Sequence, residues 1–167
     1  MPILDAHSME FISHSAEQTR RVGMRLGSLL TEGDLICLIG DLGAGKTTFV
    51  QGVAAGWGSL DPVSSPTFVI VNVYRRSEGT SQRLYHLDAY RLSSAAEAED
   101  LDLEEMIESG PLVVEWAERI QAVLPDEYLW IRLRYVDEGQ RDLLFTARGQ
   151  RYQKMLAFIR RQLYGVA

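Results

Sequence analysis

The sequence predicts an α/β domain with three layers, in which a mixed, partly antiparallel sheet carries helices on its faces. A continuous apolar run of strand length, 34–39, precedes a glycine-rich loop and a helix, as expected for a parallel strand buried on both faces. Two later strand-like runs flank 137–140, the pattern of an antiparallel hairpin. No repeat, low-complexity tract or linker interrupts the chain, so residues 1–167 are expected to form a single domain.

The first predicted helix covers about 15–30. Ser15 is a natural N-cap, and the apolar residues after it recur at helical spacing. They form the expected buried stripe of Val22, Leu26, Leu29 and Leu30.

The loop after the apolar run has the P-loop spacing, with four residues between its first glycine and Gly-Lys-Thr. Its backbone N–H groups can turn inward and surround phosphate oxygens. A lysine suits the β- and γ-phosphates, and a threonine hydroxyl suits magnesium. The motif therefore predicts a P-loop NTPase-like domain that binds ATP or ADP with Mg²⁺. The predicted cofactor-binding residues here are Gly40, Asp41, Leu42, Gly43, Ala44, Gly45, Lys46, Thr47 and Thr48.

A helix is expected to follow over 47–56, because its apolar residues share one helical face. Gly56 is the expected C-cap. Beyond it, Ser65 and Thr67 flank Pro66 in a polar turn that could carry hydroxyls to the phosphate or metal, although an ordinary strand-entry turn is an equal alternative. The stretch 75–83 is expected to connect two antiparallel strands.

A P-loop site also needs a carboxylate near the end of a neighbouring strand. Asp88 ends the strand-like run 84–88, and Glu115 ends the more apolar run 111–115. Spacing alone does not rank these two acids. His86 and Asp88 would share one strand face and could form a metal pair, but a hydrogen-bonded histidine at a strand edge is favoured.

The remaining elements complete the sheet and its helices. The acidic stretch 94–107 predicts one or two helices with a solvated face. Strands are expected over 128–133 and 141–147, and a last helix over about 152–163.

Composition limits the classes of function. The chain is 46% hydrophobic and 24% charged, as in ordinary globular proteins. Its net charge of −6 argues against strong, sequence-independent electrostatic binding of nucleic acid. The single cysteine, Cys37, lies in an apolar run, which excludes a disulfide framework and a cysteine metal site. Neither a signal peptide nor a membrane-spanning run is evident, so a cytoplasmic location is expected.

Taken together, these motifs resemble the bacterial TsaE family, formerly known as YjeE, the small P-loop ATPases of tRNA threonylcarbamoyladenosine biosynthesis. The resemblance runs through most of the chain and rests on an ordered set of motifs. These are the P-loop with Thr48, then Ser65-Pro66-Thr67, His86-Leu87-Asp88-Ala89-Tyr90-Arg91, Glu115-Trp116 and Leu124-Pro125.

The resemblance implies roles for individual residues. Thr47 and Glu115 look like the magnesium ligands, and Asp88 like the acid that positions water or metal. The 65–67 turn looks like a switch segment. Ser15 and Thr19 fall in a segment that lies near the nucleotide in this family. Two departures from the family pattern, Asp102 in place of a common glycine and Ala117 in place of a frequent proline, put only the local backbone in doubt.

The expected chemistry is ATP hydrolysis, with Lys46, Asp88 and Glu115 as the catalytic residues. Arg91 is a candidate arginine finger in cis, and without a sure one hydrolysis should be slow until a partner completes the site. The resemblance implies that TsaB and TsaD are the partners, that ATP turnover resets their assembly, and that tRNA is met only indirectly through it.

Two other functions remain open from the sequence. A small-molecule or nucleoside kinase would use the same P-loop, but the chain shows no clear arginine-rich lid. A nucleotide-gated binding module would use hydrolysis only as a timer.

Overall fold

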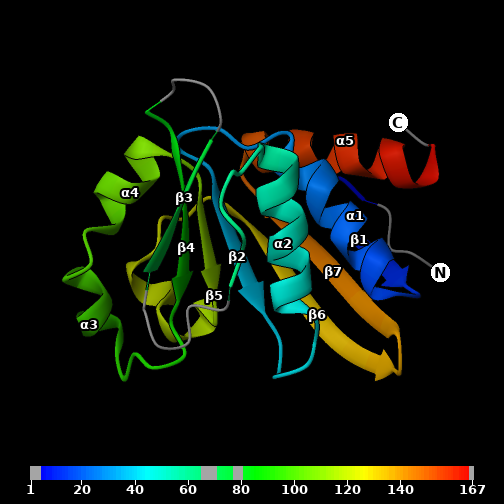
Figure 1. Cartoon of the computed structure of the whole chain (residues 1–167), viewed down its shortest axis with the longest axis horizontal. Helices are drawn as coiled ribbons and strands as arrows, with labels where there is room; N and C mark the ends of the chain where they lie inside the picture. The colour runs from blue at the N-terminus through cyan, green and yellow to red at the C-terminus, as the bar shows by residue number, and fades with distance from the viewer. Residues whose placement is uncertain (1–4, 65–70, 77–80, 166–167) are drawn as a thin grey trace.

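A computed structural model describes residues 5–64, 71–76 and 81–165. Seven strands form one mixed sheet in the order β1-β7-β6-β2-β5-β4-β3 (Figure 1). The strands are β1 Ser8–Ser13, β2 Leu35–Ile39, β3 Val71–Arg75, β4 Arg83–Asp88, β5 Leu112–Glu115, β6 Tyr128–Asp137 and β7 Gln140–Arg148. The α-helices are α1 Ala16–Gly27, α2 Lys46–Trp57, α3 Ala95–Glu99, α4 Leu103–Ser109 and α5 Gln150–Tyr164. Two short 3₁₀ turns, η1 Ala117–Arg119 and η2 Gln121–Val123, follow β5.

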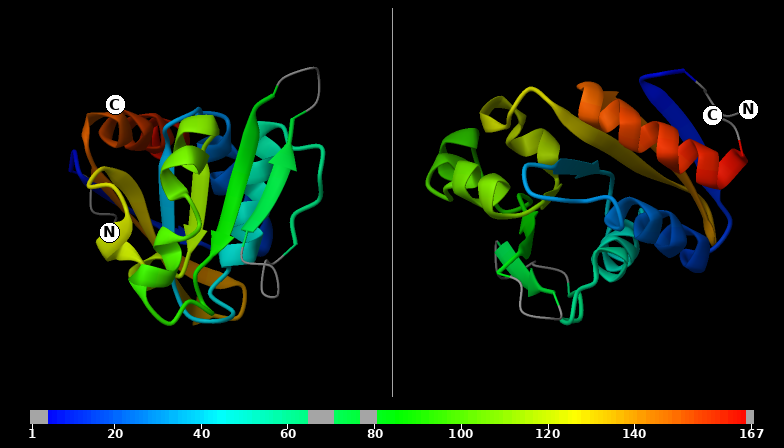
Figure 2. Two further views of the ribbon diagram at one scale, coloured as in Figure 1. Left: turned by 90° about the vertical axis from the view of Figure 1, so that its left-hand side faces the viewer. Right: turned by 90° about the horizontal axis from the view of Figure 1, so that it is seen from above.

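The four central strands, β6, β2, β5 and β4, run parallel, whereas β3, β7 and β1 pair antiparallel with their neighbours. Alternate residues of β2 enter different cores. Ile36 and Leu38 pack with α1 and α2, while Leu35 and Cys37 pack with residues of α3 and α4. The sheet is therefore covered on both faces, and the predicted three-layer α/β fold with a mixed sheet is confirmed. Figure 2 shows these helix layers from two further directions.

Helices α1 and α2 approach each other closely because glycines line their contact. A methyl group on Gly27 would lie 2.0 Å from the carbonyl oxygen of Val53, and one on Gly52 would lie 2.0 Å from that of Arg20. The same is true of Gly56, where the clash would be with the carbonyl oxygen of Met24 at 2.0 Å. This contact fixes α1 against the helix that begins at the P-loop.

The predicted helix start at Ser15 is confirmed, since its side chain accepts a hydrogen bond from the Gln18 N–H. The predicted C-cap at Gly56 was wrong. Helix α2 runs on to Trp57 and ends at Gly58, which adopts the left-handed conformation at φ 99°. Gly56 instead serves the packing against α1, where any side chain would clash.

Strand β1 was not predicted from the sequence, yet it pairs with β7 along its whole length. The acidic stretch forms two helices, and Asp102 between them adopts a left-handed backbone at φ 56°. This conformation accounts for the glycine that is common at this position in the TsaE pattern. Within the described residues, the structure contains no helix with the length and apolar character needed to cross a bilayer.

Candidate functional site

The P-loop connects the C-terminal end of β2 to the first turn of α2. Gly40 must be a glycine because a methyl group there would lie 2.3 Å from the Leu133 carbonyl oxygen of β6. Gly45 stands at the N-cap with φ 101° and makes no side-chain capping bond. The first N–H groups of the 12-residue helix α2 are therefore left for another acceptor, as an anion site requires.

Lys46 is buried, and its ammonium group lies against the loop itself. Nζ contacts the carbonyl oxygens of Gly40 and, at 3.2 Å, of Asp41. It also lies 4.1 Å from the ring centroid of Trp116, in cation–π geometry. Burial lowers the pKa of Lys46, while nearby acids, first among them Glu115, oppose that shift.

The two candidate carboxylates lie side by side. Asp88 of β4 is in direct register with Glu115 of β5, and Glu115 is in register with Leu38 of β2, close to the start of the loop. Both side chains are buried, at 8% and 3% exposure. Burial raises the pKa of Asp88, against a hydrogen bond from the Tyr90 N–H at 2.9 Å that lowers it. The two acids that sequence spacing could not rank thus share one site with Lys46.

His86 has no solvent exposure and uses both ring nitrogens. Nε2 lies 2.5 Å from Glu115 Oε2, and Nδ1 lies 2.9 Å from the Tyr74 hydroxyl. The favoured interpretation of a hydrogen-bonded histidine holds, but its strand, β4, lies inside the sheet between β5 and β3 rather than at an edge. Tyr74 could not be predicted as its partner, because the two residues lie on different strands and meet only in the folded sheet.

Magnesium is compatible with the oxygen donors at this site. In the part of the chain that the structure describes, no group of three or more His, Cys, Asp and Glu side chains could hold a metal by itself. Mg²⁺ does not need such a cage, since it usually takes one or two protein oxygens together with phosphate oxygens and water. The Thr47 hydroxyl and the carboxylates beside Lys46 supply oxygens of that kind.

A pocket of about 260 Å³ opens beside the other end of the P-loop. Its lining combines the first turns of α1 and α2 with the β6–β7 hairpin, and consists of Ala16, Thr19, Gly45, Thr48, Gly139 and Arg141. Thr19 therefore lies beside the P-loop residues Gly45 and Thr48, and its hydroxyl is bonded to Ser13 Oγ at 2.7 Å. The Ser15 hydroxyl is likewise engaged, in capping α1.

Arg141 was missed from the sequence. It lies on the hairpin strand next to Gly45, with its Nε buried and unpaired. The predicted hairpin was a signal for it. Because β6 runs parallel to β2, its C-terminal end and the hairpin that follows lie at the same edge of the sheet as the P-loop.

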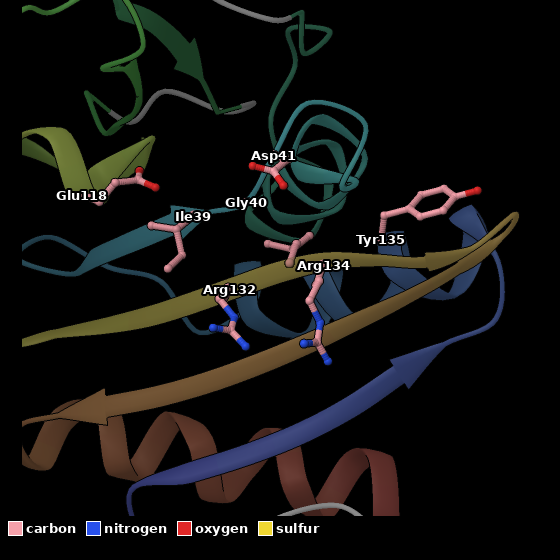
Figure 3. A pocket seen from close by; sticks show the side chains of 8 residues that line it. Ile39, Gly40, Asp41, Glu118, Arg132, Arg134 and Tyr135 are labelled. Carbon is pink, nitrogen blue, oxygen red and sulfur yellow. The ribbon is translucent and has the colours of Figure 1, made fainter.

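A second pocket, of about 270 Å³, lies between the P-loop, η1 and β6 (Figure 3). Asp41 comes from the P-loop and Glu118 from η1, whereas the side chains of Arg132 and Arg134 on β6 point away from these two acids (Figure 3). Arg134 forms an ion pair with Asp142 at 2.8 Å. With Asp41 and Glu118 on the side formed by the P-loop and η1, this side of the pocket does not suit a phosphate.

Two predicted site residues, Ser65 and Thr67, lie outside the described residues. Arg91 is exposed in the loop after β4. The structure thus brings the P-loop, Asp88 and Glu115 into one site and places Thr19 at the neighbouring pocket.

Comparisons with known proteins give one consistent family. Residues 13–143 match the family model described as threonylcarbamoyl adenosine biosynthesis protein TsaE. The chain is 40% identical over 136 residues to the tRNA threonylcarbamoyladenosine biosynthesis protein TsaE of Treponema pallidum, covering 81% of this chain and 98% of that one. It is 41% identical over 140 residues to the protein of the same name from Bacillus subtilis, covering 83% and 85%. The crystal structure of Bacillus subtilis YdiB superposes with a TM-score of 0.76 at 31% identity, covering 97% of each chain.

Proposed function

The chain belongs to the TsaE family of threonylcarbamoyl adenosine biosynthesis proteins, and from this membership we propose that it is a magnesium-dependent ATPase with slow intrinsic turnover. One observation carries the proposal. The uncapped N-terminus of α2, with Lys46 in its first turn, shares a site with the buried acids Asp88 and Glu115. ATP hydrolysis needs both kinds of group: N–H groups and a lysine to bind the phosphates, and carboxylates to hold the metal and orient water.

Phosphate binding is assigned to the loop amides and Lys46. The amides of 43–48 surround the phosphate oxygens, and the N-terminal end of α2 adds its partial positive charge. Nζ ends a flexible side chain and donates to two carbonyl oxygens of the loop. It can therefore leave these oxygens and bind the β- and γ-phosphate oxygens instead. Loss of those phosphate contacts should therefore be the main effect of removing Lys46.

The carboxylates are assigned to the metal and the water. When bound, magnesium neutralises charge on the β- and γ-phosphate oxygens, and Thr47 and Glu115 are the residues that would hold it. Asp88 accepts a hydrogen bond from the attacking water and holds it in line with the γ-phosphorus. We expect turnover to remain slow until a partner adds a further positive group to the site.

The nucleoside is assigned to the pocket beside Gly45 and Thr48. Thr48 follows the loop, so a nucleotide whose β-phosphate is in the loop directs its ribose and base toward this pocket. Thr19 and Ala16 form one wall and Arg141 another. Because its hydroxyl is already bonded to Ser13, Thr19 contributes the shape of the wall rather than a direct hydrogen bond, and Ser15 acts only by capping α1.

Family membership also supports the proposed partners, a complex of TsaB and TsaD, through which the protein would support tRNA modification in the cytoplasm. The net charge of −6 favours an indirect relation to tRNA.

The test is phosphate release from ATP by the purified protein, with and without magnesium and with and without added TsaB–TsaD. Lys46→Ala should abolish release. Lys154→Ala is the matched control, because Lys154 is the only other lysine and is exposed on α5. Slow, magnesium-dependent release that TsaB–TsaD accelerates supports the proposal. Transfer of labelled phosphate from ATP to a small molecule, without phosphate release, would replace it with a kinase.

A further inference from the structure

A line of buried polar side chains crosses three neighbouring strands toward the P-loop strand. Tyr74 on β3, His86 on β4 and Glu115 on β5 lie on the same face of the sheet. Their exposures are 3%, 0% and 3%. Each contact along the line is a hydrogen bond, at 2.9 Å from Tyr74 to His86 and at 2.5 Å from His86 to Glu115.

The chemistry of the groups sets the direction of these bonds. An ionised Glu115 only accepts, so the proton between it and His86 belongs to Nε2. In a neutral imidazole Nδ1 is then an acceptor, and the Tyr74 hydroxyl donates to it. The alternative acceptor for that hydroxyl, the Ser64 carbonyl oxygen, is more distant at 3.5 Å. A tyrosine hydroxyl can donate or accept, so it is Glu115 that sets the tautomer, and the Tyr74 hydroxyl completes it by donating to Nδ1.

The arrangement leaves one oxygen of Glu115 for the site. Oε2 is held by His86, and Oε1 is not engaged by that bond. A carboxylate on a two-bond stem has several rotamers, and a fixed bond at one oxygen restricts where the other oxygen points.

We propose that His86 is a positioning residue, which donates from Nε2 to Glu115, is itself held at Nδ1 by Tyr74, and so holds Glu115 with Oε1 facing the magnesium and water side of the P-loop site. This inference rests on the proposed function, because it assumes that Glu115 acts on the metal. His86 itself touches neither nucleotide nor metal. Without the donor from His86 the buried carboxylate would be free to turn away, and without Tyr74 the imidazole would lose its second contact.

Two substitutions at one position separate the two contacts. In His86→Gln the side-chain amide nitrogen lies near the former Nε2 and can still donate to Glu115. In His86→Asn it lies near the former Nδ1, so the donor to Glu115 is lost. Tyr74→Phe removes only the hydroxyl that holds Nδ1 of His86. Thermal unfolding of all three variants shows whether each remains folded.

The first readout is the affinity for ADP, measured by calorimetry with and without MgCl₂. We expect His86→Asn to raise the magnesium concentration for half-maximal effect by about 10- to 100-fold, the range found when a group supporting a metal ligand is lost. ADP binding without magnesium should not change. The magnesium concentration for half-maximal effect should be close to the wild-type value in His86→Gln. In Tyr74→Phe it should lie between the values of His86→Gln and His86→Asn. Equal magnesium dependence in folded His86→Asn and His86→Gln would overturn the inference.

The second readout needs neither metal nor nucleotide. The chain has three histidines, and the other two, His7 and His14, are exposed, so a slowly exchanging imidazole proton is assignable by NMR through its loss in His86→Asn. We expect the proton on Nε2. A proton on Nδ1 in the wild type would contradict the proposed direction of the bonds.

The outcomes also separate this inference from the ATPase proposal. If the wild type never releases phosphate from ATP but His86→Asn alone weakens the magnesium effect on ADP, the ATPase is wrong and the positioning role stands. If the wild type releases phosphate normally and His86→Asn has the magnesium dependence of the wild type, the ATPase proposal stands and the positioning role is wrong.

Discussion

Asp88 and Glu115 lie in direct register on the parallel strands β4 and β5, so two buried carboxylates stand side by side next to Lys46. Burial and the negative charge of Glu115 raise the pKa of Asp88, whereas the Tyr90 N–H and the positive charge of Lys46 lower it. The surroundings of the two acids differ. Glu115 is hydrogen-bonded to His86, whereas Asp88 accepts the backbone N–H of Tyr90. These different surroundings fit the different proposed roles, with Glu115 holding magnesium and Asp88 orienting water.

Neutral replacements should separate those roles. Glu115→Gln removes the charge proposed to hold magnesium, and we expect a higher magnesium concentration for half-maximal phosphate release. Asp88→Asn keeps an oxygen for the Tyr90 N–H but cannot orient water as a carboxylate does, so kcat should fall by about 100-fold or more with a smaller change in magnesium dependence. Steady-state kinetics over a magnesium series measure both. Identical profiles for the two variants would show that the acids act as one unit.

Asp88 should also give stability a defined dependence on pH. Burial raises the pKa of Asp88 above its usual value of 3.8. The folded protein therefore binds this proton more tightly than the unfolded chain, and the free energy of unfolding contributed by Asp88 falls as pH rises between the two pKa values. At neutral pH the ionised group costs stability, which Asp88→Asn should recover. Denaturant unfolding of both proteins from neutral pH downward should show an advantage for Asp88→Asn that shrinks toward about pH 4. A less stable Asp88→Asn at neutral pH would contradict this.

The proposed nucleoside pocket can be filled from α1. Ala16 lines it at the first position of the helix, and Ala16→Trp should occupy much of its roughly 260 Å³. We expect weaker binding of ATP and ADP but unchanged binding of inorganic pyrophosphate, which needs only the loop. Glu17→Trp places the same side chain on the exposed neighbouring position and serves as the control. Equal loss of pyrophosphate binding would mean that the substitution disturbs the P-loop instead.

Local signals made the P-loop, its strand and its helix predictable, because consecutive residues determine all three. The ranking of Asp88 and Glu115 was not predictable, since the register of β4 against β5 is a long-range property. The same reason hid the bond from His86 to Tyr74. Strand β1 was missed because its pattern is reversed in places, with Ser13 buried and Ile12 37% exposed.

Gly56 illustrates a signal that was interpreted wrongly. A glycine near the end of a helical pattern suggests a cap, yet this one is required by a neighbouring helix, which the local sequence does not reveal.

The glycine contact between α1 and α2 should support both folding and nucleotide binding. Gly27→Ala places a methyl group 2.0 Å from the Val53 carbonyl oxygen, so the helices must separate. Overpacking of this kind costs about 1–3 kcal/mol in the free energy of unfolding. Because α1 carries a wall of the nucleoside pocket, ADP affinity should fall as well, although no residue of the loop is changed. Gln51→Ala, on the partly exposed surface of α2, is the control for calorimetry and denaturant unfolding. A Gly27→Ala protein as stable as the control would show that the two helices can shift freely.

Asp102 offers a test of backbone conformation that is free of side-chain effects. It is exposed and adopts a left-handed backbone at φ 56° between α3 and α4, a conformation that glycine accepts without strain and alanine does not. Asp102→Gly and Asp102→Ala both remove the carboxylate, which lies close enough to Glu105 to raise the pKa of that acid. Any difference between the variants therefore reports the backbone alone. We expect Asp102→Gly to be the more stable by about 1 kcal/mol in denaturant unfolding. If the alanine variant were equally stable, the left-handed conformation at this position would not hold in solution, and the preference for glycine in the TsaE pattern would need another cause.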